Sequence, residues 1–298
     1  MGREIQQLPR AEPVLAVTSL DNRLYLLRCQ MPSQYVQQVE VYDIDSYRQL
    51  RNLTVSGLGC AFDIVACAHN RCAYISDSFV SSVHKIALSG DKITRWPVNG
   101  EPCGLSISLT HGILVTCCEA RKIKEFTTDG QLLREVILPD DVVSPWHSVQ
   151  LSSDEFIVCH GDLGDPLHRV CLVSSDGHVV KSFGGPKGES SQQMNLPVRL
   201  AVDENGFVFV ADLNNRRVLL LSPSLTFVRD VVSSKQLTWQ PLAVHLDVIG
   251  QRLYAADHAL PGWPRRIHLD VTRQLLYVAY NETIDIEKTA GNVVVFSV

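Results

Sequence analysis

The sequence predicts an all-β protein, a six-bladed β-propeller of four-stranded antiparallel blades. Three observations predict this fold. Apolar runs of strand length recur along the 298-residue chain between Gly, Asp, Asn, Ser and Pro, and helical periodicity is nearly absent. The strands repeat in groups every ~40–50 residues, which is the repeat length of propeller blades. The two ends of the chain offer strands that complete one sheet.

The clearest unit lies between residues 196 and 232. Strands predicted near 199–202 and 207–211 flank a turn that contains Asn205 and Gly206, a pair that supplies the positive φ angles of a tight hairpin. Further strands follow at 217–221 and 227–232. Four successive antiparallel strands are typical of one blade.

The same module aligns along the rest of the chain. The other predicted blades cover residues 14–55, 63–98, 104–138, 147–183 and 265–298. The last of these ends after its third strand, so we expect Glu4–Leu8 to add the outer strand and close the ring. Residues 1–298 are therefore predicted to form a single domain.

One segment does not fit this ring. Residues 244–256 match residues 267–279 at eight of thirteen positions, with an offset of 23 residues, which is about half a blade. The extra half-blade hairpin near 241–257 could be extruded, strained within the ring, or a replacement for its twin. Six blades with an accommodated hairpin are favoured over seven blades, and residues 240–264 are the weak point of the fold prediction.

Composition limits the class of protein. The 27 Lys and Arg residues stand against 32 Asp and Glu residues, a net charge of −5, which argues against a surface built to grip DNA or RNA. Hydrophobic residues make up 45% of the chain, which excludes a disordered protein. No apolar run approaches the ~18–20 residues of a membrane span, and residues 1–13 are polar. We expect a cytoplasmic, monomeric protein without a membrane partner.

The nine cysteines are an odd number in a large chain and include no Cys-x-x-Cys pair. We therefore expect reduced thiols. Several cysteines lie inside strand-like apolar runs and are predicted to be buried, namely Cys67, Cys72, Cys117, Cys159 and Cys171.

A motif at residues 183–221 is more specific than the repeat itself. A Gly-rich connector begins at Phe183, Pro197 precedes the inner strand, and residues 211–217 read Ala-Asp-x-x-Asn-x-Arg. This segment resembles the NHL repeat, whose motif positions fall on Asp212, Asn215 and Arg217. We expect these three side chains to be structural, with Asp212 accepting backbone N–H groups and Arg217 pairing with it.

The resemblance implies a propeller that recognises partners. In tripartite-motif proteins of this family, the propeller follows a RING finger, B-boxes and a coiled coil, and it selects ubiquitin-ligase substrates, other proteins or RNA. This chain shows neither zinc-finger cysteine spacing nor heptads, so the chain alone is not expected to be a ligase.

The starts of the inner strands are expected to line the central channel. The predicted ring consists of Val14, Asp63, Gly104, Ser148, Arg199 and Arg266, with His147 one residue before Ser148. We predict that Asp63, His147, Arg199 and Arg266 bind a partner at the channel mouth, because guanidinium groups suit carboxylates and phosphates.

The sequence offers no convincing catalytic set. Related six-bladed propeller enzymes hold a metal in the channel, but His147, His160, His245 and His268 do not occupy equivalent positions on different blades, so no metal or cofactor is expected. Basic clusters at 121–124, 216–217 and 265–266 are short, which disfavours RNA. The predicted function is a non-catalytic protein-interaction scaffold. The alternatives are an RNA-binding NHL propeller and a propeller lyase or hydrolase with a channel metal.

Overall fold

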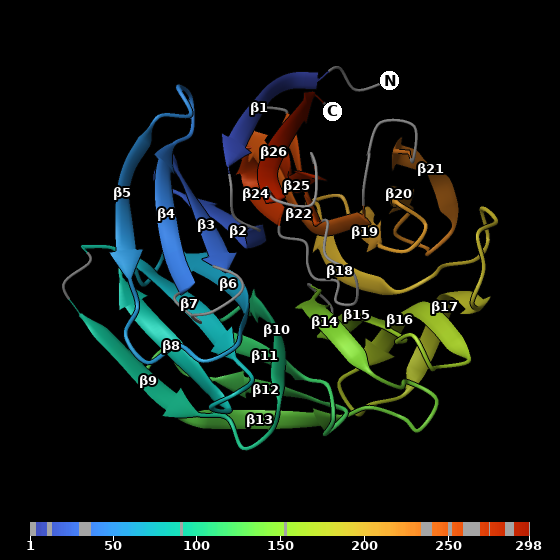
Figure 1. The fold of residues 1–298 in the computed structure, drawn as a ribbon. Coiled ribbons are helices and arrows are strands. Elements are labelled where there is room, and N and C mark those ends of the chain that lie inside the picture. The colour runs from blue at the N-terminus through green and yellow to red at the C-terminus, as the bar shows by residue number, and fades with distance from the viewer. Residues whose placement is uncertain are drawn as a thin grey trace.

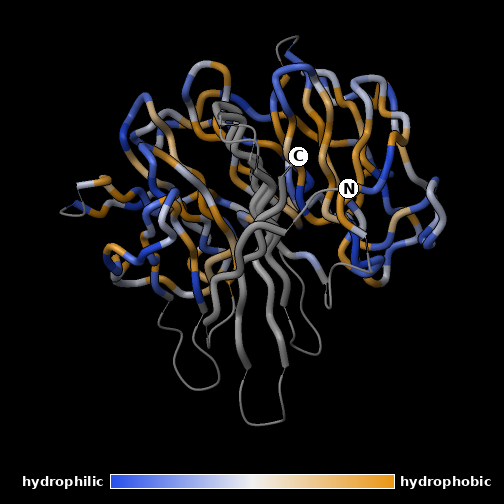
Figure 2. The backbone as a smooth tube through the Cα atoms, turned by 90° about the horizontal axis from the view of Figure 1, so that it is seen from above, coloured by the Kyte–Doolittle hydropathy of each residue, from blue (hydrophilic) through white to orange (hydrophobic). Residues whose placement is uncertain are grey.

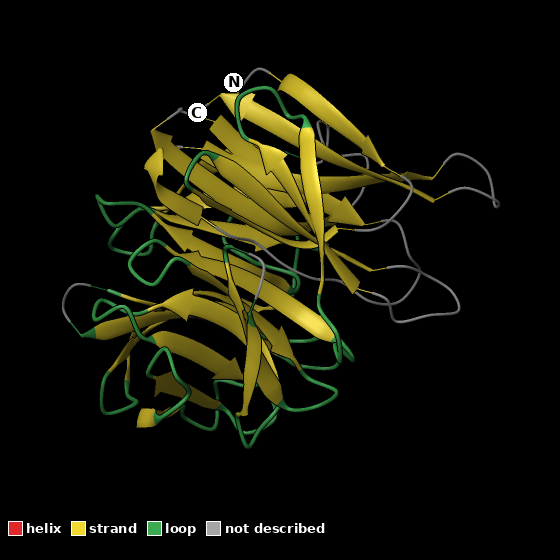
Figure 3. Ribbon diagram, turned by 90° about the vertical axis from the view of Figure 1, so that its left-hand side faces the viewer, coloured by secondary structure: helices red, strands yellow, loops and turns green. Residues whose placement is uncertain are grey.

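In the computed structural model, small sheets surround a central axis and the two chain ends meet in the same sheet (Figure 1). The structure describes residues 4–10, 14–29, 37–89, 92–151, 154–233, 240–249, 252–258, 269–273, 275–283 and 289–297. Every regular element within these ranges is a strand (Figure 3). Within the same ranges, no helix has the length and apolar character needed to cross a membrane.

Five of the sheets are four-stranded antiparallel meanders, which we number blades 1 to 5. Blade 1 comprises β2 (Val14–Leu20), β3 (Arg23–Cys29), β4 (Gln37–Asp43) and β5 (Gln49–Thr54); blade 2 comprises β6 (Ala61–Cys67), β7 (Cys72–Asp77), β8 (Ser82–Ala87) and β9 (Ile93–Pro97). Blade 3 comprises β10 (Pro102–Ile107), β11 (Ile113–Cys117), β12 (Lys122–Phe126) and β13 (Leu132–Ile137); blade 4 comprises β14 (Pro145–Gln150), β15 (Glu155–His160), β16 (Leu167–Ser174) and β17 (Val179–Pro186). Blade 5 comprises β18 (Pro197–Val202), β19 (Val208–Asp212), β20 (Arg217–Leu221) and β21 (Phe227–Val232).

The core lies between neighbouring blades. The second strands β7, β11 and β19 are buried along their whole length, because both faces of each blade pack against other blades. The outer strand β13 instead exposes most of its residues. Apolar segments therefore follow the strands, and polar segments gather at the turns (Figure 2).

The prediction of six four-stranded blades is wrong, because only five sheets among the described residues have that form. The remaining described strands are β1 (Glu4–Arg10), β22 (Gln240–Ile249), β23 (Arg252–His258), β24 (Leu269–Arg273), β25 (Leu275–Thr283) and β26 (Thr289–Ser297). They form one six-stranded sheet with the order β1-β26-β23-β22-β24-β25, which we call the closing sheet. Its pairings are both parallel and antiparallel. The expected pairing of the chain ends is present, since Leu8 lies opposite Val293.

The predicted extra hairpin is not a separate half-blade. Its strands β22 and β23 pair antiparallel inside the closing sheet. Strand β22 contacts β2 and β18, the inner strands of the two flanking blades. The register of β22 shifts between Pro241 and Ala243, as it does near the start of every other inner strand. Both copies of the duplicated segment therefore lie in the closing sheet, and the strands β24 and β25 of the second copy also contact β2 and β18. Residues 265–268 of the predicted last blade lie outside the described residues.

Gly104 shows how tightly the inner strands pack. A Cβ atom at this position would lie 2.5 Å from the Trp146 carbonyl oxygen and 2.8 Å from His147 Cδ2. Two of the nearest atoms belong to the backbone of blade 4, which cannot rotate away. Blade 3 can therefore approach blade 4 here only because residue 104 has no side chain.

We expect Gly104→Ala to lower the free energy of unfolding by ~1–3 kcal/mol, because the added methyl overpacks this contact. Gly164→Ala is the matched control, since nothing lies within 4 Å of a Cβ at that position. Denaturant unfolding of both variants measures the difference. Equal stability of the two variants would contradict the contact.

Candidate functional site: the central channel

The inner strands place six equivalent residues around the channel. Each inner strand has a register shift after its first or second residue, and the residue that follows the shift is repeated around the ring. These residues are Ala16, Asp63, Gly104, His147, Arg199 and Ala243. Asp63, Gly104 and Arg199 were placed in this ring from the sequence, whereas Val14 and Ser148 lie beside the equivalent positions. The small residues Ala16 and Gly104 leave room for one long side chain.

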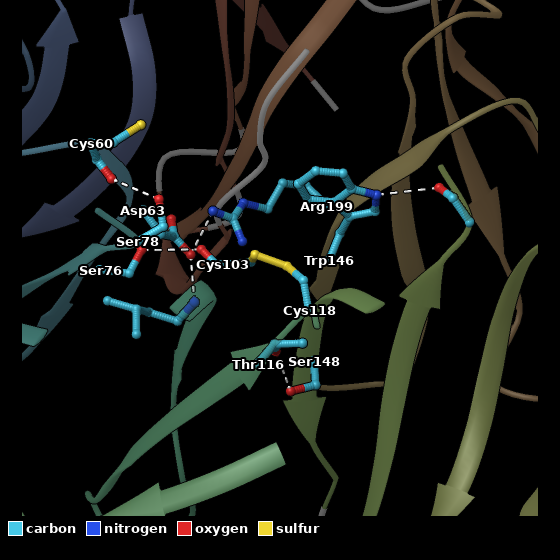
Figure 4. Close-up of a disulfide and its surroundings, with 12 residues drawn as sticks. Cys60, Asp63, Ser76, Ser78, Cys103, Thr116, Cys118, Trp146, Ser148 and Arg199 are labelled. Carbon is cyan, nitrogen blue, oxygen red and sulfur yellow. Dashed lines mark hydrogen bonds and ion pairs between the residues drawn. A yellow bond between two sulfur atoms is a disulfide. The ribbon is translucent and has the colours of Figure 1, made fainter. Parts of the chain in front are cut away.

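Arg199 fills that room. It extends from blade 5 to Asp63 of blade 2, and these blades face each other across the ring (Figures 1 and 4). Arg199 Nη2 lies 2.6 Å from Asp63 Oδ2, and the two side chains are 0% and 2% exposed. The Leu105 N–H of blade 3 donates to the same carboxylate oxygen at 2.6 Å. One buried carboxylate thus connects three blades.

Polar contacts between blades continue around this ion pair. His147 Nε2 lies 2.9 Å from the Leu105 carbonyl oxygen. Ser76 donates to the Cys103 carbonyl at 3.1 Å, and Ser106 donates to the Ser148 carbonyl at 2.8 Å. These side chains are buried. The channel residues therefore hold blades together.

The four predicted partner-binding residues differ in position. The structure brings Asp63 and Arg199 together, and it places His147 beside Leu105, the residue whose N–H binds Asp63. Arg266 lies outside the described residues. Asp63 and Arg199 already bind each other, and a partner-binding role for these residues stays a prediction.

A disulfide lies beside the channel. Cys103 of β10 bonds to Cys118, which directly follows β11, with a Cα–Cα distance of 6.0 Å. Asp63, Trp146 and Arg199 are among its surroundings (Figure 4). The expectation that the cysteines are reduced is wrong for this pair. The register that sets Pro102 opposite Cys117 brings the two sulfur atoms together, and spacing alone does not reveal it.

The other predicted thiols are free and buried, as expected, at Cys67, Cys72, Cys117, Cys159 and Cys171. Burial raises the pKa of Cys117 to about 11. It raises the pKa of Cys159 and of Cys171 to about 12. These three thiols therefore stay protonated near neutral pH, which makes them poor nucleophiles.

The NHL-like motif residues form a buried cluster at the end of β19. Asp212 accepts hydrogen bonds from the Asn195 N–H, from Asn215 Nδ2 and from Arg217 Nε, each at 2.7 Å. Arg217 also donates to the carbonyl groups of Ser190 and Gln193 in the connector. The cluster thus joins the second turn of blade 5 to the loop that enters the blade.

Equivalent contacts occur where the motif is not visible in the sequence. Like Asp212, Asp77 and His160 end the second strands of their blades, opposite the first residue of the inner strand. Asp77 lies 3.4 Å from His84 Nε2, and Arg169 Nε donates to His160 Nε2 at 3.1 Å. We call these pairs, together with Asp212 and Arg217, the blade latches. Sequence reasoning missed these roles of His84, His160 and Arg169. Position in the repeat could have found His160 and Arg169, which are equivalent to Asp212 and Arg217, but not His84, which lies two residues farther along its strand.

The described residues contain no group of three His, Cys, Asp or Glu side chains that could hold a metal ion. Of the histidines considered as ligands, His147 and His160 contact backbone carbonyl groups. The side chain of His245 and all of His268 lie outside the described part of the chain.

Comparisons with known proteins identify the fold. No family model matches the chain, and no curated protein matches it. Among solved structures, a catalytically inactive histidine-to-alanine variant of virginiamycin B lyase from Staphylococcus aureus, crystallised with quinupristin, is similar with a TM-score of 0.65 and 12% identity. That match covers 98% of this chain and 99% of the other.

Two further solved structures are similar to this chain. A chain of a nidogen/laminin complex matches with a TM-score of 0.61, 12% identity and coverage of 76% of this chain and 82% of that one. The Cps50 (Swd1) β-propeller domain of Myceliophteria thermophila matches with a TM-score of 0.59, 9% identity and coverage of 96% and 83%. At such identities the likeness shows the fold alone. The chain is a β-propeller.

We expect Arg199→Met to lower the free energy of unfolding by ~3–5 kcal/mol, because it leaves the Asp63 carboxylate buried without its charged partner. The double variant Arg199→Met/Asp63→Asn should lose less than the sum of the two single losses. Denaturant unfolding of the four proteins gives the coupling energy.

The exposed ion pair of Arg121 and Asp140 is the control for this cycle, since its Nη1–Oδ1 distance of 2.9 Å is similar but both side chains reach solvent. Its coupling should be within ~0.5 kcal/mol of zero. An additive result for Arg199 and Asp63 would show that the buried pair does not act as a unit.

His160 should make stability fall in acid. Burial, and then the Arg169 charge, lower the pKa of His160 to about 4 from an ordinary value of 6.5. Between these two values the unfolded chain binds the extra proton, so this group contributes full stability above pH ~6.5 and loses about 3 kcal/mol as the pH falls to ~4.

Thermal or denaturant unfolding from pH 7 to pH 4 measures this loss. The pH dependence should be weaker in His160→Gln and unchanged in His178→Gln, whose side chain is exposed. A His160→Gln profile parallel to that of the wild type would refute this assignment.

Proposed function

We propose that this chain is a non-catalytic, NHL-type propeller that binds a partner protein through the turns between the second and third strands of its blades. In blades 2 to 5 these turns are residues 78–81, 118–121, 161–166 and 213–216. Antiparallel topology places all four turns at the same end of the ring, and we call this end the binding face.

The exposed side chain of Phe79 is the main observation that supports this proposal. Its side chain projects from the β7–β8 turn of blade 2 and is 80% exposed. The ring lies over Gly59, where an added Cβ would approach Phe79 Cδ1 to 2.7 Å. Leu163, in the corresponding turn of blade 4, is 55% exposed. Exposed aromatic side chains are typical anchors of protein interfaces.

Hydrogen bonds to Asp77 hold the turn that contains Phe79. The Asp77 carboxylate accepts hydrogen bonds from the backbone N–H groups of Gly59, Cys60 and Phe79 at 2.6, 3.0 and 3.1 Å. Asp77 also takes part in a blade latch through His84. A side chain held in place before binding loses little conformational entropy on binding, which favours recognition.

The charges of this face favour a protein over RNA. Its four turns carry Arg121 and Arg216 against Glu119, Asp162 and Asp165. The neighbouring basic residues are engaged within the protein: Lys122 and Lys124 pair with Glu135, and Arg217 pairs with Asp212. A binding face without excess positive charge is poorly suited to phosphate contacts.

The proposal of a non-catalytic role is based on the residues of the central channel. Among the channel residues that the structure describes, Asp63 and Arg199 bind each other and His147 contacts the backbone. The likeness to virginiamycin B lyase keeps a lyase as the competing function. One zinc or other metal ion per purified chain would favour that alternative.

We expect Phe79→Ser to reduce recovery of the bound partner at least about tenfold in a pull-down, as loss of an interface anchor does. Ile137→Ser is the matched control, since Ile137 is also exposed but lies on the outer strand β13. Both variants should keep the melting temperature of the wild type within a few degrees.

Cross-linking mass spectrometry should then place the recovered protein against the turns of the binding face. Equal recovery with Phe79→Ser would refute this face as the interface. Recovery that nuclease abolishes would instead support RNA binding.

A further inference from the structure

A cavity of about 420 Å³ lies at the opposite end of the ring, between blades 1 and 2. It is lined by Asp21, Arg23, Tyr25, Arg71, Leu88 and Ser89, together with Ala87. This volume falls in the range of small-molecule sites, roughly 300–1,000 Å³. The cavity belongs to the turns between first and second strands and between third and fourth strands, so it is separate from the binding face.

The walls of the cavity come from two blades, and an ion pair and hydrogen bonds connect these blades. Arg71, in the β6–β7 turn of blade 2, reaches Asp21 in the β2–β3 turn of blade 1, with 3.0 Å between Nη2 and Oδ2. Arg51 of β5 donates to the carbonyl groups of Leu88 and Ser89 at 2.5 and 3.2 Å. These bonds occupy carbonyl oxygens that would otherwise repel an anion.

The lining is positive in a chain that is negative overall. Arg23 and Arg71 stand against Asp21 alone, whereas the whole chain has a net charge of −5. Among the described residues, no carboxylate forms an ion pair with Arg23. Arg71 reaches Asp21 through one nitrogen, and a guanidinium group has five N–H donors, so donors remain for a second acceptor.

A neutral donor completes this lining. Arg23 lies beside the hydroxyl group of Tyr25, and burial raises the pKa of that hydroxyl group. Tyr25 therefore keeps its proton at neutral pH and can donate a hydrogen bond. The guanidinium groups of Arg23 and Arg71 and the hydroxyl group of Tyr25 suit a tetrahedral oxyanion, because a planar guanidinium group can bind two phosphate oxygens at once.

We propose that this cavity binds a small phosphate monoester, with Arg23 and Arg71 contacting the phosphate and Asp21 competing with it for Arg71. A volume of about 420 Å³ holds more than the phosphate group, so the ester carries an organic substituent of modest size. The site shares no residue with the binding face, and the partner-binding proposal stands or falls independently.

Titration of the whole chain with phenyl phosphate at low ionic strength, followed by calorimetry or NMR, tests the proposal. Arg23→Gln and Arg71→Gln should each weaken binding by about tenfold, the effect of losing one charge-assisted contact. Asp21→Asn should strengthen binding severalfold, because it frees Arg71 and removes a repelling charge. Opposite signs for neighbouring substitutions cannot arise from general unfolding.

Arg121→Gln is the control, since it removes an arginine from a similar ion pair with Asp140 in blade 3. Its affinity for phenyl phosphate should equal that of the wild type. Absence of phenyl phosphate binding by the wild type, an equal loss in Arg121→Gln, or weaker binding in Asp21→Asn would overturn the site. Benzoate binding as tight as phenyl phosphate binding would overturn the phosphate class.

Discussion

The ion pair between Asp63 and Arg199 is the interaction on which the closed ring depends. It joins two blades that face each other across the axis, and the Leu105 N–H links a third blade to the same carboxylate. Burying two charges is costly, so such a pair persists only where its geometry is good and its remaining groups are satisfied. Ala16 and Gly104 meet the steric condition by leaving the centre of the ring open to a long side chain.

The blade latches also pair buried polar side chains, at positions farther from the axis of the ring. Asp77, His160 and Asp212 occupy equivalent places in blades 2, 4 and 5. Their partners Arg169 and Arg217 are also equivalent, whereas His84 lies two residues farther along its strand. The residue types differ. In blades 2 and 5 the latch aspartate also binds a residue of the turn between the second and third strands, whereas in blade 4 the latch residues bind the connector that enters the blade. A turn held by hydrogen bonds can keep an apolar side chain exposed to solvent. Phe79 is exposed on such a turn, because Asp77 binds the backbone of the turn.

The two ends of the ring consequently differ in chemistry. One end carries apolar side chains on turns fixed by buried carboxylates and rings, which suits a protein surface. The other end opens between blades 1 and 2 into a cavity lined by arginines. A propeller allows this division because the sheets fix the spacing of the turns, while the turn residues themselves are free to vary.

The sequence by itself determined the strand repeat, the pairing of the chain ends and the contact between Asp212 and Arg217, because alternation, turn residues and short motifs can be read locally. It also placed Asp63 and Arg199 at the axis, because the same position recurs in each inner strand. Only the tertiary structure decided that these two residues pair with each other, that Cys103 bonds to Cys118, and that five blades rather than six have four strands. The twin segments near residues 240 and 270 show the reason. Their local patterns are nearly the same, and only the strand pairings of the folded chain put both copies into one sheet.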